Sequence, residues 1–160
     1  MTKEEQNAVF ESWANAHMAI LHHAVNAFAQ GDDRNDLMQE VLLAVWKSIP
    51  AFRGEAQPTT FIYRVSHNTA MTWRRRQNQS TPPVNLPTPS RTNPKLDQLY
   101  EVIQTFPPLD RSLLLLSLDE VSYREMAAIH GISESLVGVR LLRARTKLME
   151  QMKEANHGSR

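Results

Sequence analysis

The sequence predicts an all-α protein built from two small helical bundle domains that are joined by a proline-rich linker. Three observations lead to this fold class. Apolar residues recur at helical spacing in both halves of the chain, strand patterns are weak throughout, and residues 77–93 hold four prolines without a periodic apolar pattern. The expected domains are therefore residues 1–76 and 94–160, with residues 77–93 as the linker.

Two helices are expected before residue 50. Thr2 and Glu5 have the spacing of a capping box, which starts the first helix, and Gly31 marks its end. Its apolar stripe is Val9, Trp13, Ile20, Leu21, Val25 and Phe28. The second helix should start at Asp32 or Asp33, where carboxylates favour a helix N-terminus, and should stop at Pro50. Its buried stripe is expected to be Leu37, Val41, Ala44 and Val45.

A third helix is expected from Thr59 or Thr60 to Arg76, after the loop AFRGEAQP. The stretch FIYRVSHNTAMTWRRR, residues 61–76, mixes aromatic side chains with arginines. Helical spacing predicts that Ile62, Val65, Thr69 and Trp73 face the first two helices. The side chains left for other faces are Phe61, Arg64, His67, Asn68, Met71 and Arg75.

The second half of the chain predicts a helix-turn-helix. Pro94 starts one helix, which runs to Pro107, and the all-apolar segment 111–118 is expected to be a short buried helix. Ser122 begins a second capping box, Gly131 suits a turn, and Ser133 can cap the final helix. Two capped helices joined by a short turn that contains glycine are typical of a helix-turn-helix, which indicates DNA binding. The alternative is a helical hairpin with a solvated basic face.

The charge distribution favours a polyanionic partner. The formal net charge is only +1, but residues 51–80 carry five arginines against one acid, and residues 122–160 carry seven basic against four acidic side chains. The chain has no cysteine, no apolar signal-peptide core near its N-terminus, and no apolar run near the ~20 residues that span a bilayer. We therefore expect a cytoplasmic protein without disulfides.

No pattern for an enzyme, a cofactor or a metal site is found. His22 and His23 lie five and six residues after His17, so no two of these histidines form a ligand pair one helical turn apart. A glycine-rich phosphate loop, a nucleophile elbow and paired catalytic carboxylates are all absent from the sequence. We expect a protein that is not an enzyme and needs no cofactor.

Two stretches resemble a known family. DLMQEVLLAVW, the FRG loop and RVSHN…RRR, in that order, resemble the second conserved region of bacterial RNA polymerase sigma factors of the extracytoplasmic-function (ECF) group in the sigma-70 family. The segment PPLDRSLLLLSLDEVSYREMAAIHGISESLVGVRLLRARTKL resembles their fourth conserved region. The resemblance covers nearly the whole chain and implies a transcription initiation factor.

The resemblance implies that the second helix docks on the clamp helices of the largest subunit of core RNA polymerase. The matching residues are Asp36, Gln39, Glu40, Leu43 and Trp46. Spacing alone places Gln39, Leu43 and Trp46 away from the buried stripe, and an exposed tryptophan is typical of a partner-binding anchor. The alternative is that Trp46 packs internally. Asn35 stands where the family often has another acid, which is expected to weaken docking slightly.

The resemblance also implies contacts with the minus-ten element. The FRGEA loop would lie near a flipped-out base of the non-template strand, and Phe61 would act as a wedge where the duplex opens. The implied minus-ten residues are Arg53, Gly54, Glu55, Ala56, Phe61, Arg64, Asn68, Arg74, Arg75 and Arg76.

The helix-turn-helix would read the minus-thirty-five element in the major groove. The implied residues are Ser133, Ser135, Gly138, Val139, Arg140, Arg143, Arg145 and Lys147. Gly138 and Val139 stand where the family often has a basic residue followed by serine, so recognition here is expected to be unusual or to depend on DNA shape.

The expected function is a sigma factor that directs core RNA polymerase to specific promoters, with recognition and melting by the N-terminal domain. The resemblance adds an anti-sigma protein as an expected partner, often membrane-anchored in this family. Two alternatives stay open from the sequence. One is a stand-alone helix-turn-helix regulator of duplex DNA, and the other is a sigma-like decoy that sequesters a partner.

Overall fold

The computed structural model describes residues 1–79 and 94–158, and every regular element in these ranges is a helix, which confirms the predicted fold class. The chain divides into two compact units, Met1–Pro87 and Thr88–Arg160. Most of the expected linker lies outside the described residues. Its first three residues, 77–79, belong to the end of a helix, so that helix continues past the expected stop at Arg76.

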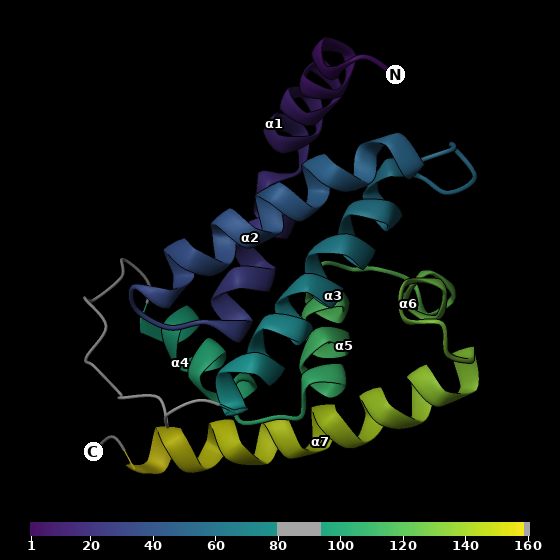
Figure 1. The fold of residues 1–160 in the computed structure, drawn as a ribbon. Helices are drawn as coiled ribbons and strands as arrows, with labels where there is room; N and C mark the ends of the chain where they lie inside the picture. Colours follow the sequence, from purple (N-terminus) through teal and green to yellow (C-terminus); the bar gives the residue numbers. More distant parts are fainter. Residues whose placement is uncertain (80–93, 159–160) are drawn as a thin grey trace. The chain divides into compact units, whose positions relative to one another are not determined.

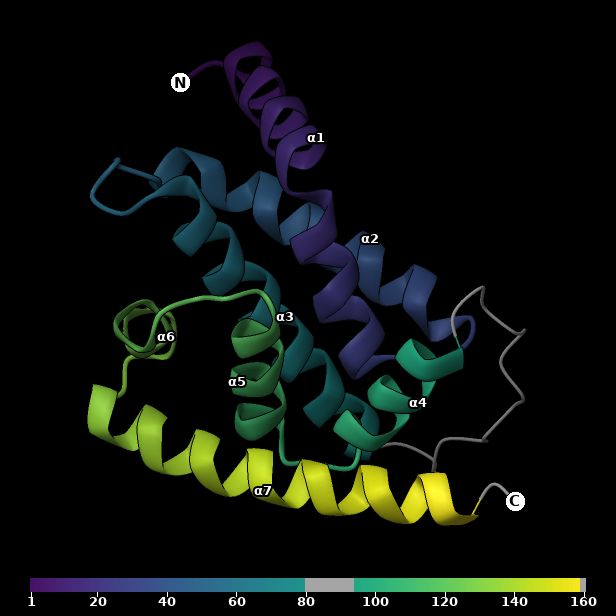
Figure 2. The ribbon, with the colours of Figure 1, turned by 180° about the vertical axis from the view of Figure 1, so that it is seen from behind.

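The first unit consists of three long helices and one short turn of 3-10 helix (Figure 1): α1 (Lys3–Phe28), α2 (Asp33–Ser48), η1 (Ile49–Ala51) and α3 (Pro58–Gln79). The predicted capping box is present, because Thr2 and Glu5 each accept a hydrogen bond from the other's backbone amide. At His17 the backbone leaves the helical region (φ −127°, ψ 24°), which divides α1 into two parts on either side of that residue (Figure 2).

The core of the first unit is formed where the three helices meet. Leu37, Val41 and Val45 of α2 are buried as the sequence predicts, whereas Ala44 is only half-buried. Trp73 of α3 is also buried, so the prediction that this tryptophan belongs to the core is confirmed. The remaining large core side chains come from both parts of α1, from Ile49 of η1 and from the start of α3.

The buried face of α3 differs from the predicted one. His67, expected on an outer face, is 1% exposed, and Ser66 and Ala70 are fully buried beside it. Val65 and Thr69, expected to face the other helices, are half-buried. Because α3 packs against both α1 and α2, its buried stripe is wider than one row of apolar residues and includes small and polar side chains.

The second unit packs three short helices against a long one. The helices are α4 (Pro94–Ile103), α5 (Pro108–Leu118), α6 (Tyr123–His130) and α7 (Glu134–Gly158). The prediction that 111–118 is a buried helix is confirmed over Arg111–Leu116. Arg111 is buried with its guanidinium donating to the carbonyl oxygens of Gln104 (2.6 Å) and Phe106 (2.9 Å), which ties α5 to the end of the preceding helix.

The helix-turn-helix is present in α6 and α7, and Ser122 and Ser133 cap its two helices as the sequence predicts. The Ser122 hydroxyl accepts from the Glu125 amide at 3.1 Å, and the Ser133 hydroxyl accepts from the Leu136 amide at 3.1 Å. Gly131 has φ +66°, a left-handed conformation that glycine adopts without steric cost. The amide of Ile132 then donates to the Ala127 carbonyl at 3.1 Å, which closes the turn.

Candidate nucleic-acid interface

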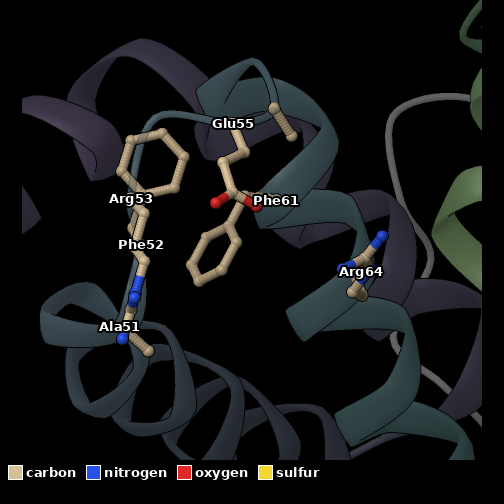
Figure 3. A pocket seen from close by; sticks show the side chains of 7 residues that line it. Ala51, Phe52, Arg53, Glu55, Phe61 and Arg64 are labelled. Carbon is tan, nitrogen blue, oxygen red and sulfur yellow. The ribbon is translucent and has the colours of Figure 1, made fainter.

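The loop between η1 and α3 covers a hollow in the first unit. The loop turns at Gly54, which has φ +75°. The hollow has a volume of about 570 Å³ and is lined by Ala51, Phe52, Arg53, Glu55, Ala56, Phe61 and Arg64. Five of these seven residues come from the 51–56 segment and two from the first turns of α3 (Figure 3). The FRGEA loop and Phe61, which the resemblance assigns to the minus-ten element, therefore lie together.

An aromatic cluster forms one wall of this hollow. The rings of Phe52 and Phe61 have centroids 5.0 Å apart, and Trp13 of α1 packs edge-on against both at 5.1 and 5.8 Å. Phe52 and Phe61 are both half-buried, so part of each ring is left accessible in the hollow. The sequence reasoning missed Phe52 as a functional candidate. Its place in the FRG motif could have indicated it, because a phenylalanine in an otherwise polar loop needs a packing partner.

Charged groups surround the aromatic wall. Arg53, Glu55 and Arg64 are exposed, and Figure 3 shows the Glu55 carboxylate near Phe61, with Arg64 farther along α3. The hollow therefore offers a flat apolar surface, hydrogen-bond donors from two guanidinium groups and one carboxylate acceptor. A planar group with polar edges, such as a nucleobase, fits this combination.

The other predicted minus-ten residues extend along α3 away from the hollow. Asn68, Arg75 and Arg76 are exposed, and Arg74 is half-buried. Arg76 is already engaged, because its guanidinium donates to the Glu40 carboxylate of α2 at 2.5 Å. The structure thus joins a residue implied in DNA contacts to one implied in polymerase contacts.

The outward face of α2 is only partly free. Asp36, Gln39 and Leu43 are exposed, and half of the Leu43 side-chain surface (50%) is accessible. Trp46 is half-buried instead of exposed: its indole N–H donates to the Asn7 side chain at 2.8 Å, and its carbonyl accepts from Gln6 at 2.6 Å. The accessible part of this face is therefore centred on Leu43.

Three of the four basic residues predicted on α7 contact groups of their own unit. Arg140 forms an ion pair with Asp110 at 3.0 Å, and the Lys147 ammonium lies 5.4 Å from the centre of the Phe106 ring. Arg145 donates to the Ser117 hydroxyl at 2.5 Å and to the Tyr123 hydroxyl at 3.4 Å. Arg143 is exposed and takes part in none of these contacts.

The remaining predicted residues of the helix-turn-helix lie on the first turns of α7. Ser133 caps the helix and Ser135 is exposed. Val139 is 47% exposed. Gly138 is half-buried, and a methyl group added there would lie 3.7 Å from the Tyr123 ring, an ordinary van der Waals contact.

One histidine of the second unit has a perturbed titration. His130, the last residue of α6, has its Nε2 atom 2.7 Å from the hydroxyl oxygen of the fully buried Ser112. Desolvation by burial lowers the pKa of His130 from 6.5 to about 4. The imidazole is therefore neutral at pH 7 and belongs to the packing of α6 on α5.

Within the described residues, no cluster of three or more His, Cys, Asp or Glu side chains could hold a metal ion. Among the helices that the structure describes, none is long and apolar enough to cross a bilayer.

Comparison with known proteins assigns both units. The family model for sigma-70 region 2 matches residues 6–80, and the model for sigma-70 region 4 matches residues 96–148. The RNA polymerase sigma factor YlaC of Bacillus subtilis is 23% identical, over 98% of this chain and 99% of its own length. The ECF RNA polymerase sigma-E factor of Escherichia coli is 25% identical, over 76% of this chain and 74% of its own.

Two solved structures have the same fold. One is the sigma factor RpoE of Bartonella quintana in complex with the anti-sigma factor NepR, with a TM-score of 0.73 and 18% identity over 89% of this chain and 95% of that one. The other is CnrH in complex with the cytosolic domain of CnrY, with a TM-score of 0.69 and 20% identity over 92% of this chain and 90% of that one.

The presence of both sigma-70 regions in one chain, the second of them in the unit that contains the helix-turn-helix, identifies a DNA-binding transcription initiation factor. The chain belongs to the sigma-70 family of RNA polymerase sigma factors, in the ECF group. It binds core RNA polymerase and directs promoter-specific, DNA-templated transcription initiation. Members of this family are non-enzymatic initiation factors.

Proposed function

We propose that the hollow beneath the 51–56 loop receives one unpaired base of the minus-ten element. The observation that carries this proposal is the aromatic wall, because Phe52 and Phe61 offer partly accessible rings in a hollow that is rimmed by charged groups. Stacking of a base on an aromatic side chain contributes about 1–3 kcal/mol. That free energy offsets much of the few kcal/mol needed to unstack and extrude a base from the duplex.

The arginines of α3 hold the strand next to this base. Arg64 and Arg75 are exposed on the same helix that presents Phe61, and Asn68 lies between them in the sequence. Guanidinium groups bind phosphate oxygens in bidentate geometry, and these contacts fix the position of the strand without reading its sequence. In this proposal the hollow recognises the identity of the base, and the arginines of α3 bind the phosphate backbone of the DNA strand.

The face of α2 around Leu43 docks on the clamp helices of the polymerase. Leu43 is an exposed leucine between the polar Gln39 and the Trp46 turn, so it is suited to the centre of a small protein interface. Trp46 supports this face from within, because its indole N–H is bonded to Asn7 of α1. Glu40 enters the interface with Arg76 as its neighbour on α3.

The helix-turn-helix contacts the upstream duplex mainly through the first turns of α7. Arg143 is the exposed cation there, whereas Arg140 and Arg145 are bonded to Asp110 and Ser117. We assign the last two to the packing of α7 on α5 and Arg143 to direct contact with DNA. The protein itself performs no bond chemistry, which belongs to the polymerase.

An anti-sigma protein is proposed as a further partner. Two structures that share this fold are complexes of a sigma factor with an anti-sigma factor, NepR in one and CnrY in the other. A partner of the same class would control how much of this chain reaches the polymerase.

Promoter-specific run-off transcription with purified protein and core polymerase tests the proposal. Specific transcripts are expected from promoter-bearing genomic templates. Leu43→Asp should weaken polymerase binding at least tenfold, because it puts a charge at the centre of the docking face, while Leu118→Asp, an equally exposed leucine in the second unit, should not. Stable polymerase binding without a transcript from any genomic template would favour the decoy instead, and DNA binding without polymerase binding would favour the stand-alone regulator.

A further inference from the structure

Three apolar side chains are exposed on the early turns of α7, the second helix of the helix-turn-helix: Leu136, at 40%, and the more exposed Val139 and Leu142. Val139 is 47% exposed and Leu142 is 69% exposed, and both lie in the first three turns of α7. Exposed apolar residues that occur singly need no explanation, but two at i and i+3 spacing on one helix form a common surface.

These side chains point away from the body of the unit. Val137, Leu141 and Ala144 of the same helix are buried at 0%, 0% and 5% exposure, and they define its inner face. At 3.6 residues per turn, Val139 lies almost opposite the centre of that inner face, and Leu142 is next to it. In a helix-turn-helix this outer face of the early turns is the part that enters the major groove.

The charges around the two residues indicate a nucleic acid in preference to an apolar protein groove. Arg143 is exposed one turn from Val139, and the Ser135 hydroxyl is exposed on the preceding turn. Between residues 133 and 149 the sequence contains one acid, Glu134, against four basic residues. The surface therefore combines an apolar centre with a hydroxyl and a guanidinium, and its local potential is positive.

We propose that Val139 and Leu142 recognise thymine through its C5-methyl group in the upstream promoter element. This inference rests on the proposed role of α7 in binding the upstream duplex. The thymine methyl is the apolar group that base pairs present in the major groove, and short apolar side chains are its natural partners. Val139 and Leu142 cannot donate or accept hydrogen bonds through their side chains, so methyl contact is the base-specific interaction open to them.

The proposal also explains how α7 recognises a DNA sequence although most of its basic side chains contact groups of their own unit. Arg140, Arg145 and Lys147 contact groups of their own unit, whereas Arg143, which is exposed beside the apolar pair, takes part in none of these contacts. Specificity would then depend on one guanidinium and two methyl-reading side chains. We expect a thymine-containing upstream element next to the base pair read by Arg143.

Substitution of uracil for thymine provides the test, because it removes only the methyl group. Holoenzyme made from the full chain and core polymerase selects duplexes from a DNA library with a randomised upstream region, and each thymine of the selected element is then replaced in turn by deoxyuridine. At one or two positions the replacement should weaken binding of the wild-type holoenzyme about fourfold, the effect of one methyl group removed from a dry contact. Val139→Ala or Leu142→Ala should remove that sensitivity at its own position.

Met149→Ala is the matched control, since Met149 is an exposed apolar residue (61%) on a later turn of α7, and it should leave the sensitivity to uracil intact. A selected element without thymine, or a uracil effect of the same size in wild type and both variants, would overturn the inference. Loss of anti-sigma binding with unchanged discrimination between thymine and uracil would overturn it too and would make the surface a protein-docking face. Run-off transcripts from the thymine template show in the same experiment whether the proposed function itself holds.

Discussion

The stability of the second unit should decrease as the pH falls below about 6.5, because of His130. The imidazole nitrogen of His130 lies 2.7 Å from the hydroxyl of the fully buried Ser112, and burial lowers its pKa from 6.5 to about 4. In the unfolded chain the pKa returns to about 6.5. Between these two values the unfolded state binds a proton that the folded state does not, so acidification favours unfolding. The stabilising contribution is full above pH 6.5 and is lost as the pH falls toward 4.

The size of the effect follows from the two pKa values. With values of 6.5 and about 4, the linkage relation gives a loss of about 2 kcal/mol between pH 7.5 and pH 5. The side chain is only half-buried, and solvent screening reduces the expected loss to about 1–2 kcal/mol. This is a large fraction of the stability of a small helical domain.

Urea denaturation at pH 7.5 and pH 5.0 measures this loss. All three tryptophans, Trp13, Trp46 and Trp73, lie in the first unit, so fluorescence follows that unit, while circular dichroism at 222 nm follows both. The transition seen by circular dichroism but not by fluorescence belongs to the second unit. His130→Gln keeps a side-chain amide near Ser112 and cannot titrate, so it should remove most of the pH dependence of that transition. Equal pH dependence in the wild type and the variant would refute the assignment to His130.

Four other substitutions test the site and the fold. Phe61→Ala should reduce promoter opening about 5- to 150-fold, as judged by permanganate reactivity of melted thymines, with little change in core-polymerase affinity; equal losses in both would mean that Phe61 serves the fold alone. Arg143→Ala should weaken binding to upstream duplex by about 1–3 kcal/mol in a fluorescence-anisotropy titration, whereas Lys153→Ala, an exposed cation far along α7, should have little effect. Gly138→Ala should stabilise the second unit by about 0.5–1 kcal/mol in urea denaturation, because the new methyl group meets its nearest neighbour at 3.7 Å. Gly131→Ala should destabilise the same unit by about 1–2 kcal/mol, because its φ is +66°; an equal effect at both glycines would contradict this reasoning.

The fold follows from local patterns where a single rule determines the structure. Thr2 and Ser122 cap their helices, and Gly131 closes the turn, because each depends on a few neighbouring residues in the chain. The burial of His67 could not be predicted in the same way. It depends on α3 packing against two helices at once, and a polar residue inside a wide helix interface looks like a surface residue in the sequence.

In the candidate site too, local motifs could be predicted from the sequence, whereas contacts between distant residues could not. The FRGEA loop and Phe61 could be named from the sequence, but the packing of Phe52 and Phe61 on Trp13 depends on contacts between distant parts of the chain. The sequence also did not show that most of the basic residues on α7 contact groups of their own unit. A row of basic residues on α7 indicates DNA contacts, and only the structure shows that Arg140 faces Asp110 in another helix.

The ion pair between Arg140 and Asp110 affects how DNA binding responds to salt. Each phosphate neutralised by a protein cation releases condensed counterions and steepens the dependence of affinity on salt by about 0.9 in the logarithmic slope. A guanidinium that keeps its carboxylate partner adds almost no net charge at the DNA surface. The upstream contacts of this sigma factor should therefore lose less affinity in concentrated electrolyte than the number of basic residues on α7 indicates.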